Sequence, residues 1–482
     1  MALLEVRNLK TNFYSRFGIS RAVEESAKAP EATPRGTEEP ATADEPAITL
    51  NDFEAHRIFQ RRGAACDITV SGTYQGRPEA IEAQISRFDS QEVVMPWTVV
   101  DGSPANGIFV GVIAGVPQGG WYRLSVRFRD RHTVMAAGRS PWAVGLLAAC
   151  IGQSNMREWF YAGNDIQAHN LVSVNSSGAW QKADNLGNGA AAFANRLIVY
   201  LGVPVGLLDY AVNGSGLRRE ADWGTGYWAD RAPDSIYDRF IQGVAAAGGA
   251  VEYVIWMQGE ADAARKTITE TQYRSALQDF ITRQVRKDII NGSHMANLPF
   301  LVVGMPKRPV GQDEPHQAIR NALTAVTHAV DDCYLAAVTL DLQNQGHQHL
   351  TPEAYAKLGR RTAQTVLYLL GKADYYRGPS VTQAQKVTDR IIDLQLILRG
   401  GNDIEPAEGL TGFQVLGPDR SPVELSRIER MTPSSIRIHL AQATPEARRV
   451  TYLYGAMPDS QGAVHDNSAL RLPLEPFEMV VE

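Results

Sequence analysis

The spacing of apolar and polar positions changes along the chain. Between residues 48 and 140, apolar residues recur at every second position in short segments such as 67–74 and 121–128. Glycine and proline separate these segments, as in 115–120. Such alternation predicts antiparallel strands with one buried face. We therefore expect a small β-sandwich-like domain over residues 48–141.

From residue 142 onward, continuous apolar runs alternate with segments of helical periodicity. Apolar runs occupy 142–149, 205–210, 253–257, 300–303 and 336–340, and helical patterns occupy 190–199, 272–285 and 352–370. This order predicts a parallel sheet covered by helices on both faces, an α/β domain over residues 142–375. Short strand patterns return later, as in 435–440 and 450–454, and predict a C-terminal β-domain over residues 376–482.

The N-terminal region has a different composition. Residues 24–47 are rich in Glu, Ala, Pro and Thr, which predicts a disordered linker. Residues 1–23 form a leader of unclear origin. Residues 3–11 resemble the opening strand of peptide-transporter ATPases, but no G-x-x-x-x-G-K-[ST] loop follows, so we expect no nucleotide role. The leader lacks the pattern of a secretory signal peptide, and the sequence as it stands predicts a cytoplasmic protein.

Composition narrows the class of protein. A chain of 482 residues usually forms more than one domain. The net charge of −6 argues against a nucleic-acid binder, and the apolar runs are too short to span a membrane. The three cysteines, Cys66, Cys150 and Cys333, exclude a disulfide framework and a four-cysteine zinc site. We expect Cys150 and Cys333 to be buried, and the sequence leaves the oligomeric state open.

Ser154 follows the first apolar run of the α/β region. Gly152 breaks that run, so Ser154 would lie on a turn at the carboxyl edge of the sheet, beside the N–H groups of a following helix. A serine nucleophile needs an exposed oxygen, a base and oxyanion donors, and this position offers the first of these. For an isolated Gly-Gln-Ser-Asn segment, a polar turn without catalytic role is the better explanation, so the partners decide.

Two later strand ends carry candidate oxyanion donors. Gly214 lies in a glycine-rich turn, where a backbone N–H can approach a ligand closely, although an ordinary turn has the same composition. Gln258 follows a buried strand, and its amide can donate to developing negative charge. Glu260 and Asp262 are candidates for metal ligands or a general base, or for acceptors that hold a loop together.

The candidate base is His349. Thr351 can cap a helix that begins at Pro352, which places His349 on a short loop just ahead of a helix. A neutral imidazole there can take the serine proton and return it to a leaving group. His347 and His349 are also a candidate metal pair, but no third ligand stands out. We therefore predict no metal and no organic cofactor.

These segments together resemble the SGNH-hydrolase superfamily, specifically its sialate O-acetylesterase-like carbohydrate esterases. The resemblance rests on 152–156, 256–260 and 350–353 and covers roughly 142–374. It implies a three-layer α/β/α sandwich around a parallel sheet, and the flanking β-regions are similar to modules that accompany this family. It also implies that Ser154 is the nucleophile and His349 the base. The Ser154 and Gly214 N–H groups and the Gln258 side chain would form the oxyanion hole.

One position departs from the family pattern. The family commonly has an Asp three residues before its histidine, and here that residue is Gly346. Asp341, at the end of the strand predicted over 336–340, is the nearest substitute for the orienting carboxylate. The alternative is a Ser–His dyad steered by a backbone carbonyl. Both remain open, because the third member orients the imidazole and does not accept the proton.

The predicted function is a serine esterase that removes O-acetyl groups from a carbohydrate, a sialate or another acetylated glycan, through an acetyl-enzyme. Trp223, Tyr227 and Trp228 are candidate sugar-stacking residues, with core packing as the alternative for each. The expected partner is an acetylated glycan, which is also consistent with an extracellular or virion role. The competing hypotheses are a catalytically decayed glycan-binding or structural module of a phage tail or cell surface, which Gly346 favours, and a general SGNH lipase or thioesterase.

Overall fold

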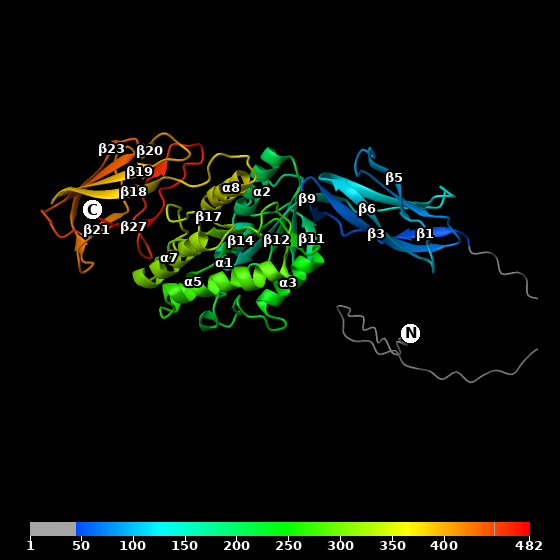
Figure 1. Cartoon of the computed structure of the whole chain (residues 1–482), viewed down its shortest axis with the longest axis horizontal. Helices are drawn as coiled ribbons and strands as arrows, with labels where there is room; N and C mark the ends of the chain where they lie inside the picture. Colours follow the sequence, from blue (N-terminus) through cyan, green and yellow to red (C-terminus); the bar gives the residue numbers. More distant parts are fainter. Residues whose placement is uncertain (1–44, 448) are drawn as a thin grey trace, which may run out of the picture. The chain divides into compact units, whose positions relative to one another are not determined.

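The computed structural model describes residues 45–447 and 449–482 (Figure 1). The predicted leader, and all of the predicted linker except its last three residues, lie outside the described residues. Residues 46–482 form one compact unit.

Strand β9 (Trp142–Gly152) is buried along its whole length. It pairs in parallel with β12 (Val205–Asp209) and β14 (Tyr253–Met257). The strand order across this region is β11-β10-β12-β9-β14-β16-β17. The pairings from β10 to β17 are parallel, whereas β11 is antiparallel to β10, so the sheet is mixed. The remaining strands are β10 (Val172–Ser176), β11 (Ala179–Lys182), β16 (Phe300–Val303) and β17 (Cys333–Ala337).

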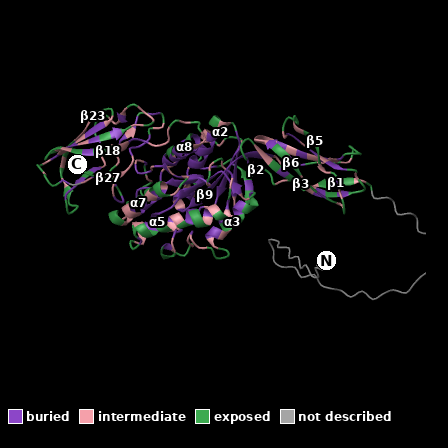
Figure 2. Ribbon diagram, viewed as in Figure 1, coloured by how far each residue is buried: buried purple, intermediate pink, exposed green. Residues whose placement is uncertain are grey.

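Successive β9 residues contribute to two different hydrophobic clusters because side chains alternate along a strand. Leu147 and Ala149 belong to a cluster with α3, α5 and α7, whereas Leu146 and Ala148 belong to one with α1, α2 and α8. Figure 2 shows this region as mostly buried. The helices are α1 (Ser154–Tyr161), α2 (Asn188–Leu201), α3 (Ile236–Ala246), α4 (Glu260–Ala264), α5 (Glu270–Asp279), α6 (Arg286–Asp288), α7 (Asp313–Ala329) and α8 (Pro352–Leu369), with η1 (Arg219–Ala221) and η2 (Phe280–Val285).

The N-terminal strands connect to the central sheet through β9. The first residues of β9 pair with β2 and β7, and its later residues pair with β12 and β14. The backbone pairing therefore runs across the boundary predicted at residue 141, and the division into separate domains stays a prediction. These strands are β1 (Ala47–Leu50), β2 (Arg57–Gln60), β3 (Ala65–Gln75), β4 (Ile81–Arg87), β5 (Val93–Asp101), β6 (Ile108–Pro117), β7 (Gly119–Phe128) and β8 (Met135–Ala137).

The C-terminal region consists of strands, as the sequence pattern predicts. They form two four-stranded antiparallel sheets and one strand pair, with a shared core that includes Leu394, Ile436 and Val450. The C-terminal strands are β18 (Ser380–Thr388), β19 (Ile391–Ile397), β20 (Ile404–Glu405), β21 (Phe413–Leu416), β22 (Pro422–Val423), β23 (Leu425–Thr432), β24 (Ser435–Leu440), β25 (Arg449–Tyr452), β26 (His465–Asp466) and β27 (Phe477–Val480). The two remaining strands, β13 (Ala250–Val251) and β15 (Ile290–Asn291), form a separate parallel pair in the α/β region.

The sequence predicts that two cysteines are buried and that no apolar segment is long enough to span a membrane. Cys150 and Cys333 are buried, as predicted, and Cys66 is partly buried. Within the described residues, every helix is too short or too polar to cross a membrane.

Candidate active site

Ser154 is the first residue of α1, directly after the end of β9. Gly152 permits this turn, because its φ is +140° and a Cβ atom there would lie 2.1 Å from the Met257 carbonyl oxygen. The Gln153 N–H donates to that same carbonyl at 3.0 Å, which fixes the turn against β14. Ser154 is half-buried, and its N–H belongs to the first turn of a helix, where N–H groups have no partner in the helix. Ser154 therefore lies on a turn at the carboxyl end of a buried strand, as the sequence predicts, and its role as nucleophile stays a prediction.

The Gly214 loop lies against the same turn. The Val212 N–H donates to the Gly152 carbonyl at 3.0 Å, and the Ser215 hydroxyl also contacts this oxygen at 3.3 Å. Gly214 itself has φ of +70°, a conformation that favours glycine. The loop that carries one predicted oxyanion donor is thus tied to the turn that carries Ser154.

Gln258 is buried in a closed hydrogen-bond network. Its Nε2 donates to Asp262 Oδ2 at 2.6 Å and to the Ser215 carbonyl at 3.1 Å, and its Oε1 accepts from the Tyr273 hydroxyl at 2.7 Å. Because both N–H groups of an amide are occupied, none is directed at a substrate. In this arrangement Gln258 holds loops together, and its predicted oxyanion role requires a rearrangement.

Asp262 binds the residues that follow Gly214 in its loop. This buried carboxylate accepts hydrogen bonds from the Leu217 N–H at 2.8 Å and the Arg218 N–H at 3.3 Å, besides the Gln258 amide. Burial raises the pKa of Asp262 to about 6, although these hydrogen bonds stabilise the charged carboxylate and so lower the pKa. Of the roles considered for Asp262, the structure shows the loop-holding one.

His349 lies just before α8, as the sequence predicts. Thr351 caps the helix by accepting from the Ala354 N–H at 3.2 Å, and Pro352 is its first residue. His349 Nε2 is buried, and no hydrogen-bond partner for it exists among the described residues. The His347 ring packs against it at a centroid distance of 4.9 Å. Among residues 45–447 and 449–482, no three His, Cys, Asp or Glu side chains are grouped so that they could hold a metal ion. His347 and His349 therefore have no third ligand in this part of the chain.

Asn155 and Tyr355 hold the His349 loop, and the sequence analysis gave neither a role. Asn155 Nδ2 donates to the carbonyl of Gln348 at 3.0 Å and to Glu260 Oε1 at 2.7 Å. Its Oδ1 accepts from the Tyr355 hydroxyl at 2.6 Å, and that hydroxyl accepts from the Leu350 N–H at 3.4 Å. The residues on both sides of His349 are therefore tied to the residue after Ser154. Asn155 directly follows Ser154 in the chain and Tyr355 lies six residues after His349, and this nearness is the only signal in the sequence.

The charges near His349 act on its pKa in opposite directions. Burial lowers the pKa of His349 from its ordinary value, the Glu158 carboxylate raises it, and His347 lowers it. Glu158 lies on α1, one helical turn after Ser154. Among the described carboxylates, Glu158 is therefore the one whose charge raises the pKa of His349.

Asp341 is bound elsewhere. Its two carboxylate oxygens accept from the Arg361 guanidinium at 2.8 and 2.7 Å, in a pair whose Arg361 side chain is only 5% exposed. A bidentate pair of this kind fixes the carboxylate on its partner. This geometry does not support the tentative assignment of Asp341 as the group that orients His349.

The two tryptophans proposed for sugar stacking differ. Trp228 is fully buried, donates from Nε1 to the Ser215 hydroxyl at 2.9 Å and packs on Trp256 and Phe280. It is a core residue and offers no face to a sugar, which corrects the expectation for this side chain. Trp223 is 53% exposed, and the Arg265 guanidinium covers one face of its ring at 3.8 Å. Its role as a stacking residue stays a prediction.

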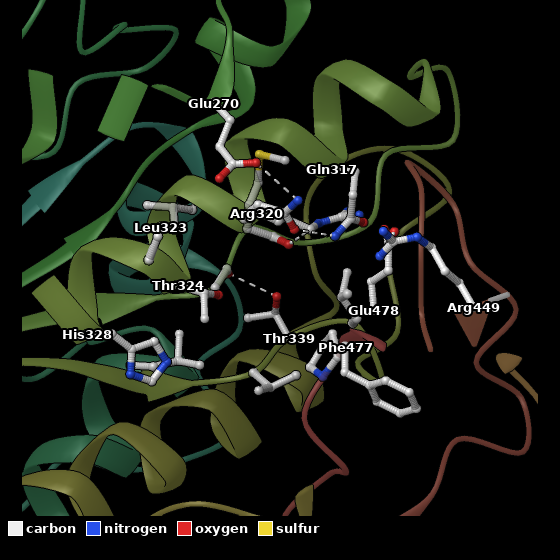
Figure 3. Close-up of a pocket in the computed structure, with 18 residues that line it drawn as sticks. Glu270, Gln317, Arg320, Leu323, Thr324, His328, Thr339, Arg449, Phe477 and Glu478 are labelled. Carbon is white, nitrogen blue, oxygen red and sulfur yellow. Dashed lines mark hydrogen bonds and ion pairs between the residues drawn. The ribbon is translucent and has the colours of Figure 1, made fainter. Parts of the chain in front are cut away.

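Another cavity lies away from these residues. It has a volume of about 530 Å³ and is lined by residues of α7 and of the C-terminal strands, including Arg320, His328 and Phe477 (Figure 3). Arg320 already donates to the carbonyls of Met305 and Pro306, at 3.2 and 2.8 Å. None of the predicted catalytic residues lines this cavity, so we do not assign the chemistry to it.

The family comparison covers the region that contains all of these candidates. Residues 147–368 match the family described as carbohydrate esterase, sialic acid-specific acetylesterase. This part of the chain is similar to a carbohydrate esterase domain. The chain is accordingly a carboxylic ester hydrolase, as the resemblance noted from Ser154 and Gln258 implies.

One solved structure is similar to the chain at the level of the fold. A carbohydrate acetylesterase from Xanthomonas citri is similar with a TM-score of 0.65 and 21% identity, over 90% of this chain and 99% of that one. A carbohydrate acetylesterase family member from Sinorhizobium meliloti has a TM-score of 0.32 and 13% identity, over 47% of this chain and 99% of that one. No curated protein sequence matches the chain.

A conservative substitution tests whether the hydrogen bonds of Tyr355 hold the His349 loop in place. Tyr355→Phe removes the hydrogen bonds of the hydroxyl to Asn155 and Leu350 but keeps the ring. We expect the free energy of unfolding to fall by about 1 kcal/mol. Because His349 loses part of its support, kcat for a small acetyl ester should fall by roughly tenfold at an unchanged KM. An unchanged kcat in a destabilised variant would show that the network only stabilises the fold.

Proposed function

We propose that the chain is a serine esterase that removes O-acetyl groups from carbohydrate through an acetyl-enzyme intermediate. The observation that carries this proposal is the joint placement of Ser154 and His349. Ser154 lies at a helix start with the Gly214 loop tied beside it, and Asn155 connects that helix to the His349 loop. The Xanthomonas citri protein of similar fold is itself a carbohydrate acetylesterase.

In the proposed reaction, the Ser154 hydroxyl attacks the acetyl carbonyl while His349 takes its proton. The N–H groups of Ser154 and Gly214 stabilise the oxyanion, with Gln258 as a third donor if its network opens. His349 then protonates the sugar oxygen as it leaves. Water, activated by the same imidazole, hydrolyses the acetyl-enzyme and releases acetate.

The proposal includes the architecture of the family. We assign the esterase domain to residues 142–375 as a three-layer α/β/α sandwich, and the segments 48–141 and 376–482 to flanking β-domains. Helices from both hydrophobic clusters support the layered arrangement. The flanking strands would provide surfaces for a glycan on either side of the esterase domain.

The substrate class is tested by acetate release. Wild type is incubated with acetylated mono- and oligosaccharides and with 4-nitrophenyl esters of short and long acyl chains. The proposal predicts acetate release from the sugars and a steep loss of rate with acyl length. Comparable rates on long acyl esters would indicate a lipase or thioesterase. Binding of glycans without release of acetate would indicate a module whose catalytic site has decayed.

A pH–rate profile tests the role of His349. The base must be neutral, and because the pKa of His349 is lowered, the acid limb of kcat/KM should lie below pH 6.5. Glu158→Gln removes a charge that raises this pKa, so the limb should move to lower pH. His347→Gln removes a charge that lowers it, so the limb should move to higher pH. Shifts in the same direction, or none, would mean that another group titrates.

The orienting group is tested at Asp341. Asp341→Asn breaks a largely buried ion pair with Arg361, and we expect the free energy of unfolding to fall by about 3 kcal/mol. Because the carboxylate does not contact His349, kcat of the folded variant should stay within a few-fold of wild type. A loss of about 10⁴-fold in kcat would instead identify Asp341 as the triad carboxylate. Denaturant unfolding and ester hydrolysis separate the two effects.

A further inference from the structure

A second cavity lies at the carboxyl edge of the sheet, beside α1. Its volume is about 440 Å³, within the usual range of small-molecule sites. Its walls come from α1, the turn after β10, the end of β12 and α3, and include Arg157, Ser176, Asp209, Tyr210, Val212 and Arg239. Ligands of open α/β sheets bind at this edge. No role has been assigned to this cavity above.

The cavity lies next to the proposed nucleophile. Arg157, in its wall, follows Ser154 by three residues on α1, and residues at this spacing are neighbours on a helix surface. Val212, also in its wall, donates its N–H to the Gly152 carbonyl at 3.0 Å, two residues before Ser154. Ser154 itself does not line the cavity, but a molecule bound there would lie against the helix that carries Ser154 and the segment that leads into the Gly214 loop.

Asp209 brings unused acceptor capacity to the cavity. Its side chain is only 5% exposed, and it accepts from the Tyr161 hydroxyl at 2.9 Å and from the Ala211 N–H at 3.3 Å. A carboxylate has about four acceptor sites, and a buried one is usually paired with a cation. Among the described residues, Asp209 forms no ion pair. Part of its hydrogen-bonding capacity is left for a ligand.

Arg157 brings the matching donors. Its guanidinium lies over the Tyr161 ring, 4.7 Å from the centroid, and it forms no ion pair with a described carboxylate. Tyr161 thus positions both groups, Arg157 with its ring and Asp209 with its hydroxyl. Both residues line the same cavity, and burial raises the pKa of Asp209 while the charge of Arg157 lowers it.

An acceptor and a donor on one cavity wall match the chemistry of sugar hydroxyls. Each hydroxyl can donate to a carboxylate and accept from a guanidinium, and hydrogen bonds to charged groups are the stronger ones. We propose that this cavity binds the hexopyranose ring that carries the acetyl ester, with Asp209 accepting from its free hydroxyls and Arg157 donating to them. This inference rests on the proposed function, because it assigns the sugar of the ester to a cavity that borders the segments carrying Ser154 and Gly214.

The test compares a sugar ester with an ester that has no sugar. For Asp209→Asn, kcat/KM on a monoacetylated methyl hexopyranoside should fall by about 10- to 100-fold, because a charged acceptor is lost. The rate on 4-nitrophenyl acetate should change by no more than about twofold. Arg157→Gln should show the same selectivity. Asp89→Asn, on the exposed turn between β4 and β5 and outside the cavity wall, is the matched control and should leave both rates unchanged.

A second measurement covers the case in which a variant is poorly folded. Deacetylated methyl hexopyranosides should inhibit hydrolysis of 4-nitrophenyl acetate by wild type, and Arg157→Gln should weaken this inhibition by at least tenfold. Equal losses on both esters, or unchanged inhibition, would overturn the sugar site while leaving the esterase intact. Absence of Ser154-dependent hydrolysis of every ester by wild type would instead overturn the proposed function.

Discussion

Ser154→Ala is expected to lower kcat for acetyl esters by about 10⁴- to 10⁶-fold, the range found when a serine nucleophile is removed. The alanine variant keeps the helix start, the Gly214 loop and the His349 loop, because none of the hydrogen bonds that hold these segments involves the Ser154 hydroxyl. What remains is catalysis by the oxyanion donors and by substrate binding. Stability and substrate affinity should therefore be close to those of wild type.

The measurement is single-turnover hydrolysis of 4-nitrophenyl acetate, together with an unfolding curve for each protein. Ser103→Ala, on an exposed turn after β5, is the matched serine control and should hydrolyse the ester at the wild-type rate. A Ser154→Ala protein that keeps most of its activity would show that the nucleophile is elsewhere.

His349→Ala is expected to cause the second large loss, on the order of 10⁴-fold or more in kcat. Without the imidazole, no group takes the proton of the Ser154 hydroxyl, and the leaving sugar oxygen has no acid. The substitution also leaves a space where the ring was. Added imidazole should enter that space and restore part of the rate, an effect that a purely structural residue would not show.

The control for this rescue is Ser154→Ala, in which imidazole should restore nothing. The double variant should be about as slow as either single variant, because the two residues act as a unit. Losses that multiply would mean that Ser154 and His349 act independently, against the proposed mechanism.

The sequence predicts the sheet and the places of Ser154 and His349 in it because their signals are local. The buried run of β9, the break at Gly152, and the Thr351 cap before α8 each depend on a few neighbouring residues. The boundary at residue 141 was harder to predict. β9 is long enough to pair with N-terminal strands at one end and with parallel strands at the other, and no residue in the strand marks the change.

Other features depend on contacts between distant segments. Trp228 follows a polar turn and was a reasonable surface candidate, but it packs on Trp256 and Phe280 from later elements. Asp341 is near His349 in the chain, yet the partner that binds it is Arg361 on α8. Asn155 contacts Glu260 and Tyr355, which are more than a hundred residues away. Pairings of this kind are set by the fold and cannot be assigned from spacing alone.

The most direct test of the central claim is labelling of the active enzyme with a serine-directed alkyl phosphonate ester, followed by mapping of the modified peptide by mass spectrometry. Such a reagent reacts with the activated serine of an esterase and leaves an adduct that water does not readily remove. The account predicts one adduct per chain, on Ser154, and loss of acetate release in proportion to labelling. An inactivated enzyme with its adduct on another residue, or an active enzyme that the reagent does not modify, would contradict it.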